Sequence, residues 1–145
     1  MAVSTYSFGD IKTVISHPDF ASLSLYNEGI GDMTVSKAND NTAHDTAADG
    51  SVMVSKIIVN NGTVTINAQQ TSPLHSYLNN LYNYLKTAST NKWAQIQLDI
   101  RAPYLHEQKI CTGGSFQKDA DTPYQAQGQN ITWTLMFADI TTQKI

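Results

Sequence analysis

Apolar and polar side chains alternate along two long stretches of the chain, which is the pattern of β-strands with one buried face. Between residues 93 and 101 the apolar positions are Ala94, Ile96, Leu98 and Ile100. Between residues 130 and 139 they are Ile131, Trp133, Leu135 and Phe137. Weaker strand patterns lie at about 3–15, 22–37, 106–112 and 114–118. The chain therefore reads as mainly β.

Two further β-rich segments, 52–59 and 63–69, flank the sequence Asn60-Asn61-Gly62. An Asn-Gly pair favours a type I′ turn, which needs positive φ at both central residues, so this pattern predicts a β-hairpin. The first segment is apolar on both faces around residues 57–59. We therefore expect it to be buried on both sides, either inside the fold or against a neighbouring subunit.

One helix is predicted, at about 73–87. Ser72 offers an N-cap hydroxyl, and Pro73 suits the first helical position because its missing N–H would have no partner there. Apolar residues then recur at steps of three and four: Leu74, Tyr77, Leu78, Leu81, Tyr82 and Leu85. The order of strands, one helix and strands favours an antiparallel β-sandwich or barrel with one flanking helix, in a single domain spanning 1–145.

The segment at about 37–50 fits no element. It is polar, rich in small residues and without apolar periodicity. A loop of this length in a compact domain is usually functional or disordered. A solvated flexible loop is one interpretation; we favour a partner-binding arm, because strands on both sides would hold its ends firmly.

Charge is scarce, and its scarcity excludes several functions. Charged residues make up 14% of the 145, the net charge is −3, and Arg101 is the single arginine, so the chain lacks the basic surface of a nucleic-acid reader. Thr, Ser, Asn and Gln supply about a third of the chain. One cysteine, Cys111, excludes an internal disulfide framework. The sequence shows neither a membrane span nor a signal-peptide pattern, so the cytosol is the default location.

No motif for catalysis or metal binding is found. The sequence has no nucleophile elbow, no phosphate-binding loop and no calcium loop, and its histidines are scattered singly: His17, His44, His75 and His106. We expect no enzyme activity, metal or cofactor. Cys111 reads as a small buried hydrophobe, and Trp93 and Trp133 as core anchors. The two tryptophans and the amide-rich surface leave a small carbohydrate- or ligand-binding β-sandwich as an alternative.

An ordered set of short motifs resembles the bacteriophage tail tube proteins. It comprises TYSFGDI at 5–11, ADGSVM at 48–53, QTSP at 70–73 leading into LYNY at 81–84, and ITWTL at 131–135. The resemblance implies a small β-sandwich or barrel with a flanking helix, six copies of which form a ring, and rings that stack into a hollow tube for DNA ejection. The family is also similar in fold to the inner tubes of contractile injection systems, so a tube protein of a bacterial contractile secretion system is a second alternative.

If the resemblance holds, the segment at 37–50 becomes an arm that reaches a neighbouring subunit, in the same or the adjacent ring. The candidate contact residues are Asn39, Asp40, Asn41, Thr42, His44, Asp45, Asp49 and Gly50. Subunits that align their sheets edge to edge would remove exposed strand edges by closure.

The resemblance also implies a channel wall along which DNA slides. A cationic wall would bind phosphates and hold the genome, whereas a neutral or acidic wall leaves transit smooth. The polar-face candidates for this wall are Asp32, Asn67, Gln69 and Asp99. The implied partners are further copies of the chain and the sheath, tape-measure and baseplate proteins, with transient passage of DNA and no membrane. The implied location is the tail of a virion assembled in the host cytoplasm.

Overall fold

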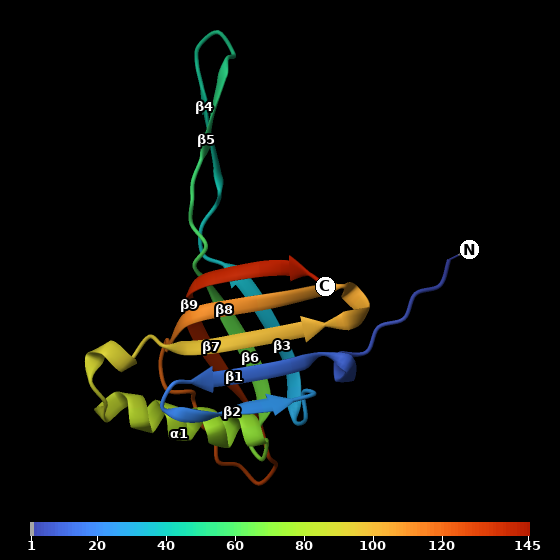
Figure 1. Cartoon of the computed structure of the whole chain (residues 1–145), viewed down its shortest axis with the longest axis vertical. Helices are drawn as coiled ribbons and strands as arrows, with labels where there is room; N and C mark the ends of the chain where they lie inside the picture. Colours follow the sequence, from blue (N-terminus) through green and yellow to red (C-terminus); the bar gives the residue numbers. More distant parts are fainter. Residues whose placement is uncertain (1) are drawn as a thin grey trace.

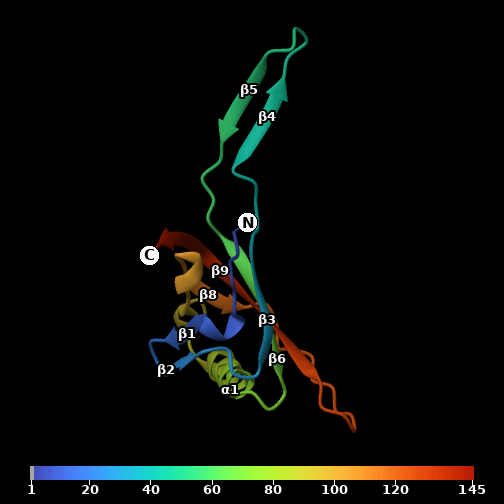
Figure 2. The same ribbon diagram turned by 90° about the vertical axis from the view of Figure 1, so that its right-hand side faces the viewer.

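Seven strands form one antiparallel sheet that curls around a single α-helix (Figures 1 and 2). The computed structural model describes residues 2–145. The strand order is β2-β1-β7-β8-β9-β6-β3, and β4 pairs with β5 in a separate two-stranded sheet. The strands are β1 (Lys12–His17), β2 (Phe20–Leu25), β3 (Ile30–Lys37), β4 (Thr42–Thr46), β5 (Val52–Lys56), β6 (Gly62–Gln69), β7 (Ile96–Ala102), β8 (Glu107–Phe116) and β9 (Asn130–Lys144). The expected mainly β, antiparallel fold with one flanking helix is confirmed, with a single curled sheet forming a half-barrel.

The helix α1 (Pro73–Thr87) has the predicted bounds. Its N-cap is Ser72, whose Oγ accepts a hydrogen bond from the His75 backbone N–H at 3.1 Å. The residues of α1 that are buried share one face: Leu74, Leu78, Leu81 and Leu85. This leucine face lies in the concave side of the sheet, where it closes one end of the half-barrel.

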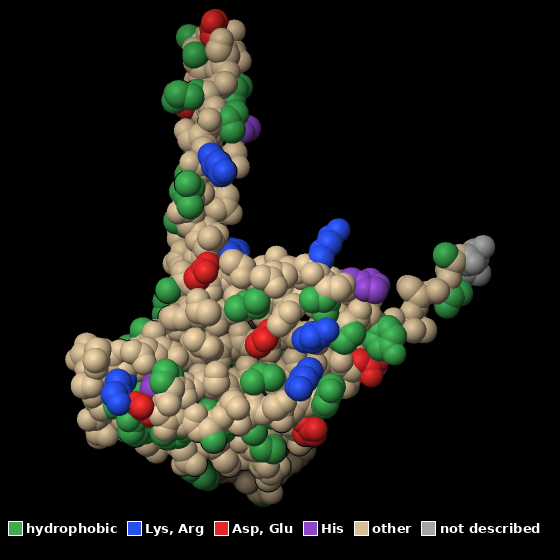
Figure 3. Space-filling view, in the orientation of Figure 1, with side chains coloured by type: hydrophobic (Ala, Val, Ile, Leu, Met, Phe, Trp, Pro, Cys, Tyr) green, Lys and Arg blue, Asp and Glu red, His purple; other side chains and the backbone are tan. Residues whose placement is uncertain are grey.

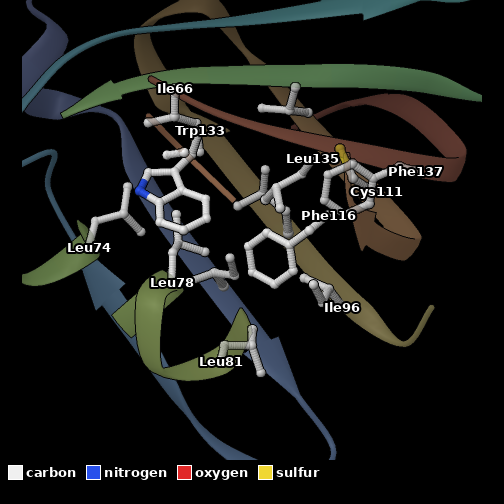
Figure 4. Packing of buried hydrophobic residues seen from close by; sticks show 14 of the residues in the cluster. Ile66, Leu74, Leu78, Leu81, Ile96, Cys111, Phe116, Trp133, Leu135 and Phe137 are labelled. Carbon is white, nitrogen blue, oxygen red and sulfur yellow. The ribbon is translucent and has the colours of Figure 1, made fainter. Parts of the chain in front are cut away.

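The core lies between the leucine face and the inward side chains of β6, β8 and β9 (Figure 4). Trp133 is its largest member and only 1% of its surface is exposed. Its indole N–H donates to His75 Nδ1 at 3.0 Å, and its ring centroid lies 5.5 Å from that of Phe116. The prediction that Trp133 anchors the core is confirmed. Trp93, by contrast, is only half-buried, beside Tyr82.

Strand boundaries differ from the sequence pattern where a turn or a bulge intervenes. The predicted strand at 93–101 begins three residues later, because η2 (Thr90–Lys92) is a 3₁₀ turn capped by Trp93. The two strands predicted at 106–112 and 114–118 are one strand, β8. The pairing of β8 with β7 shifts register between Ile96 and Leu98, opposite Gly113, and Gly113 takes a φ of 66° that suits glycine.

The hairpin predicted between 52–59 and 63–69 is wrong. β5 pairs with β4, while β6 pairs with β3 on one side and β9 on the other. Gly62 begins β6 and does not lie in a type I′ turn. A Cβ there would collide with the Ser36 carbonyl oxygen and the Ile140 side chain, so this position needs glycine for the close approach of strands.

Two sets of polar contacts, one at each end of β1, hold this strand against its surroundings. Buried Asn27 accepts a hydrogen bond from the Thr13 hydroxyl, and its amide donates to the carbonyls of Phe8 and Ile11, which holds η1 (Phe8–Asp10) against the sheet. At the other end Lys92 pairs with Asp19 at 2.7 Å. The Lys92 ammonium and then the Tyr84 hydroxyl hold the pKa of the Asp19 carboxyl below its ordinary value.

The core predicts a large effect of truncating Trp133. Trp133→Ala removes a fully buried ring and leaves a cavity, so we expect the free energy of unfolding to fall by about 3–5 kcal/mol. Urea denaturation followed by circular dichroism measures it. The matched control is Trp93→Ala, which should cost clearly less because Trp93 is half-buried. Equal losses at the two positions would contradict this account of the core.

Candidate assembly surfaces

A hairpin projects from the body of the molecule (Figures 1 and 2). We call residues 38–61, which contain β4 and β5, the arm. β4 and β5 pair in register from Thr42 opposite Lys56 to Thr46 opposite Val52. At the tip, Asp49 accepts a hydrogen bond from the Ser51 backbone N–H, and Gly50 has a φ of 89°. Every residue of the arm is exposed except Val59, which is half-buried.

The arm carries exposed hydrophobic side chains that nothing in the chain covers. Ile58 is 83% exposed, and Met53 and Val54 are each 62% exposed. Val52 and Ile57 are exposed as well, and because successive side chains of a strand alternate, Val52 and Val54 lie on one face of β5 and Met53 on the other. An isolated two-stranded hairpin is at best marginally stable in water, and a concentration of exposed apolar groups marks a contact with another molecule.

The root of the arm is fastened to the sheet. The Asn41 side-chain amide donates to the carbonyls of Ile57 and Val59, at 3.0 Å each. The Lys37 ammonium donates to the carbonyls of Asn60 and Ile140, and the Ile140 N–H donates back to Asn60. The Asn41 bonds tie the two sides of the arm to each other, and the Lys37 and Ile140 bonds join the arm at Asn60 to β3 and β9, so the body of the protein sets the direction in which the arm leaves it.

The arm is longer than the sequence pattern indicated. It begins after Lys37, which ends β3, and the expectation that this segment fits no element is wrong because it contains β4. All the candidate contact residues lie in the arm: Asn39, Asp40, Asn41, Thr42, His44, Asp45, Asp49 and Gly50. It then continues to Asn61 and takes in the apolar segment 52–58, which the sequence assigned to a hairpin with β6. That apolar segment is the functional feature that sequence reasoning misplaced. The sequence signal was the apolar character of this segment on both faces. Burial in the body does not explain that character, because residues 52–58 are exposed.

A polar surface lies on the convex side of β3, β6 and β9. The Asn67 amide donates to Asp32 at 2.7 Å, and its oxygen accepts a hydrogen bond from the Thr132 hydroxyl. The register of the strands and the burial of the alternate residues give the other members of this face, which are polar except for Met136: Thr34, Ser36, Thr63, Thr65, Thr134 and Met136. Of these residues only Asp32 is charged.

The other two candidate wall residues, Gln69 and Asp99, lie in different places. Gln69 ends β6 and is exposed on the same side as Asn67. Asp99 lies on β7, which β8 and β9 separate from β6 in the sheet. Its carboxylate accepts hydrogen bonds from the Gln108 amide at 2.7 and 2.9 Å. The structure thus brings Asp32, Asn67 and Gln69 to one surface and leaves Asp99 outside it.

The other groups that could carry chemistry, His17 and Cys111, are buried in the body of the protein. His17 Nε2 bonds to the Lys92 carbonyl, and burial raises the pKa of the Cys111 thiol to about 11. Within residues 2–145 no three His, Cys, Asp or Glu side chains gather as metal ligands. An open, polar groove of about 580 Å³ has Lys118, Asp121 and Thr132 among its lining residues. In the same described range no helix is long and apolar enough to cross a bilayer.

The chain combines a folded body, a hairpin whose apolar side chains are left in water, and a polar face without reactive groups. These features are typical of structural proteins that work through contacts with other proteins. Residues 3–144 match the family model of the bacteriophage PhiTE tail tube protein, and the chain belongs to this family. It is therefore a structural tail tube protein and not an enzyme. Among curated proteins, none matches the chain significantly in sequence.

Solved structures share the fold across almost the entire chain. The anti-feeding prophage baseplate, 6-fold symmetrised, contains a chain that is 12% identical with a TM-score of 0.62, covering 99% of this chain and 98% of that one. The tube-terminating cap of the same particle gives 10% identity, a TM-score of 0.61 and coverage of 100% and 95%. The sheath-tube complex of the extracellular contractile injection system PVC gives 10%, 0.55, and 92% and 89%. At these identities the likeness establishes the fold.

The root of the arm predicts a local effect of Asn41→Ala. The variant loses two exposed hydrogen bonds, about 1 kcal/mol together, so amide exchange across 42–56 should rise roughly fivefold. The melting temperature of the body should not change, because β4 and β5 pair only with each other. Hydrogen–deuterium exchange mass spectrometry measures the effect, with Asn79→Ala on the exposed side of α1 as the control. Unchanged exchange in the arm would show that Asn41 does not hold the root.

Proposed function

We propose that this chain is the repeating subunit of a phage tail tube, in which six copies form a ring and rings stack into a channel for DNA ejection. The single observation that carries the proposal is the arm, a fastened hairpin with an apolar surface that a lone chain leaves in water. A contact from this arm to a different surface on the next copy is heterologous. Such a contact generates a ring when the rotation closes and a filament when it repeats along an axis.

The similar structures support the ring number and the partners. One of them belongs to a baseplate that is 6-fold symmetrised, another to a sheath-tube complex and a third to a sheath/tube terminator. By analogy the chain would contact its own copies, a sheath and a baseplate, and the family resemblance adds a tape-measure protein as a partner. The tail of a virion assembled in the host cytoplasm is the corresponding location.

The open sheet supports ring closure. β2 and β3 are its outermost strands, and each has one side without a partner strand in the sheet. Unpaired strand edges favour association with other chains, and closure into a ring removes them. Copies arranged side by side would bring such edges together and extend the curled sheets around the ring.

We assign the polar face on β3, β6 and β9 to the wall of the channel. The strand residues of this face are mostly hydroxyl and amide groups with one carboxylate and no cation, and the one lysine beside it, Lys118, lines the groove next to Thr132 and Thr134 together with Asp121. Because each subunit repeats around the ring and along the tube, a single lysine on this face would recur many times in the wall. The near absence of charge is thus the property that lets DNA slide.

The tube of a bacterial contractile injection system remains a second candidate function. It is favoured by the similar structures, two of which come from the extracellular contractile injection system PVC. The family match favours the phage tail. Electron microscopy of purified particles distinguishes the two, because a phage tail is attached to a DNA-filled capsid.

Removing the arm tests the proposal. The Ile57 N–H donates to the Asn41 carbonyl at 2.9 Å, so a two-residue link can replace residues 42–56 without strain. We expect this variant to fold with an unchanged melting temperature and to form no long tubes in negative-stain micrographs. Val54→Asp should abolish tubes in the same way by placing a charge on the apolar surface, whereas Val54→Ile should keep them. Long tubes from the shortened chain would reduce the arm to a solvated loop.

The channel wall predicts an effect of charge at Thr65. Thr65→Lys should leave particle assembly intact and slow DNA ejection, measured by dye uptake into released DNA. Binding through 6–10 phosphate contacts weakens about 10³–10⁵-fold between 50 and 200 mM salt, so the slowing should vanish as salt is raised. Thr65→Glu is the matched control and should eject at the normal rate. Ejection that is insensitive to lysine at this position would place the polar face outside the channel.

A further inference from the structure

Two of the four histidines are built into contacts between the sheet and the ends of α1. His75 lies in the first turn of α1, and its Nδ1 accepts a hydrogen bond from the Trp133 indole N–H at 3.0 Å. His17 ends β1, and its Nδ1 accepts a hydrogen bond from the Asp19 backbone N–H at 3.1 Å. The ring of His17 also lies edge-on to that of Tyr84, near the other end of α1, with the ring centroids 6.4 Å apart. The two histidines thus join both ends of the helix to the sheet.

Both hydrogen bonds require a neutral imidazole. A backbone N–H and an indole N–H can only donate, so Nδ1 of each histidine must offer its lone pair. In His17 the proton is then on Nε2, which donates to the Lys92 carbonyl at 2.9 Å. An imidazolium carries a proton on both nitrogens and accepts no hydrogen bond. Protonation of either ring at Nδ1 would therefore break the bond and set two N–H groups against each other.

The surroundings of His17 offer no carboxylate that is free to pair with a charged ring. Only 3% of the residue is exposed. The titratable and charged groups that face it are Asp19 in the turn after β1, Tyr84 on α1 and Lys92 in η2. The Asp19 carboxylate is already bonded to the Lys92 ammonium at 2.7 Å and to the Tyr84 hydroxyl at 2.9 Å, so this acid and this base offset each other. Neither of the two ion pairs within residues 2–145 includes a histidine. A cation buried here would therefore lack a partner of its own.

His75 lies where the helix itself opposes a positive charge. It is the third residue of α1, and the N-terminus of a helix carries the positive end of the helix dipole. The first turn holds no Asp or Glu, and the strand packed against His75 presents Trp133, which does not titrate. In the neighbouring turn Gly29 lies close to Ser72, and Glu28 beside it is exposed to water. Protonation of His75 would thus add a cation at the wrong end of the helix and take the acceptor from the buried Trp133 N–H.

We propose that His17 and His75 form an acid-sensitive latch that holds α1 in the half-barrel at neutral pH and releases it in mild acid. The imidazoles of an unfolded chain take up protons around about pH 6.5. The folded chain takes up none at these two Nδ1 atoms without breaking their bonds, so it binds fewer protons than the unfolded chain. By linkage its stability is then full above this range and falls as the pH falls through it. The latch belongs to the single chain and does not depend on the proposed tube.

Replacing both histidines by asparagine tests the latch. The asparagine Oδ1 takes nearly the place of Nδ1 and accepts a hydrogen bond, but it does not titrate. Between pH 7.5 and 5.5 the two histidines should raise the equilibrium constant for unfolding by up to about tenfold each, about a hundredfold together. Carboxyl groups contribute little in this window, because they ordinarily titrate near about pH 4. Urea denaturation at the two pH values measures the change, and the double variant His17→Asn with His75→Asn should lack the hundredfold part of it.

The matched control is His44→Asn with His106→Asn. These histidines are exposed, His44 on the arm and His106 directly after η3 (Pro103–Leu105), and Figure 3 shows histidine side chains at the surface of the arm and of the body. His106 has a φ of 54°, a conformation that asparagine also adopts. The control variant should therefore fold and keep the full loss of stability in mild acid.

A loss of stability in mild acid that is equal in the two double variants would overturn the latch and leave the tail tube function standing. If asparagine at 17 or 75 prevents folding, nuclear magnetic resonance of the unmodified protein decides. Imidazole signals of His17 and His75 that shift only when the chain unfolds support the latch. Signals that shift together with those of His44 and His106, while the sheet stays folded, overturn it.

Discussion

The leucine face of α1 packs against Trp133 and Phe116 inside the curled sheet, and every surface described above depends on that packing. The aromatic rings stand between the helix and the strands, so the sheet cannot flatten without opening a cavity in the core. The curl carries β3 around to face β7 across a groove lined by Met33, Val35 and Ile100, and turns a polar convex side toward solvent. One helix fills one end of the half-barrel, and the opposite end is left open for another molecule.

The arm shows how a weak element can have a definite role. β4 and β5 bury little, and a hairpin of that kind gains most of its order from what covers it. Its root is nevertheless closed by Asn41 and tied to the sheet by Lys37, which limits the directions it can take. The loss of conformational entropy when a partner binds the arm is therefore smaller than it would be for a free loop. A stable body and a directed but uncovered arm together suit a subunit that is folded before it assembles.

The proposed tube explains why the chain carries so few charges. Each surface charge of a repeating subunit recurs around every ring and along the whole length, so charges that are harmless on one molecule repel or bind strongly in the assembly. Hydroxyl and amide groups keep the polar face wet without that effect. The strand residues of the polar face include no lysine or arginine, and Lys118 beside Thr132 and Thr134 is accompanied by Asp121.

The sequence by itself determined the local structure. Ser72 and Pro73 begin α1, the spacing of its leucines defines the buried face, and the alternation around Trp133 marks a core strand, because these signals act over a few residues. It also carried the family resemblance and the start of the arm after Lys37. Only the tertiary structure decided the partners of the strands. The Asn61-Gly62 signal is local, but β6 gains more by pairing on both sides with β3 and β9 than by folding back on β5, and Gly62 is what lets the strands approach. The apolar residues 52–58 therefore belong to the arm, and two strands separate Asp99 from Asn67. Neither outcome could be predicted from a short stretch of sequence, because the packing of the whole core sets the pairing between distant segments.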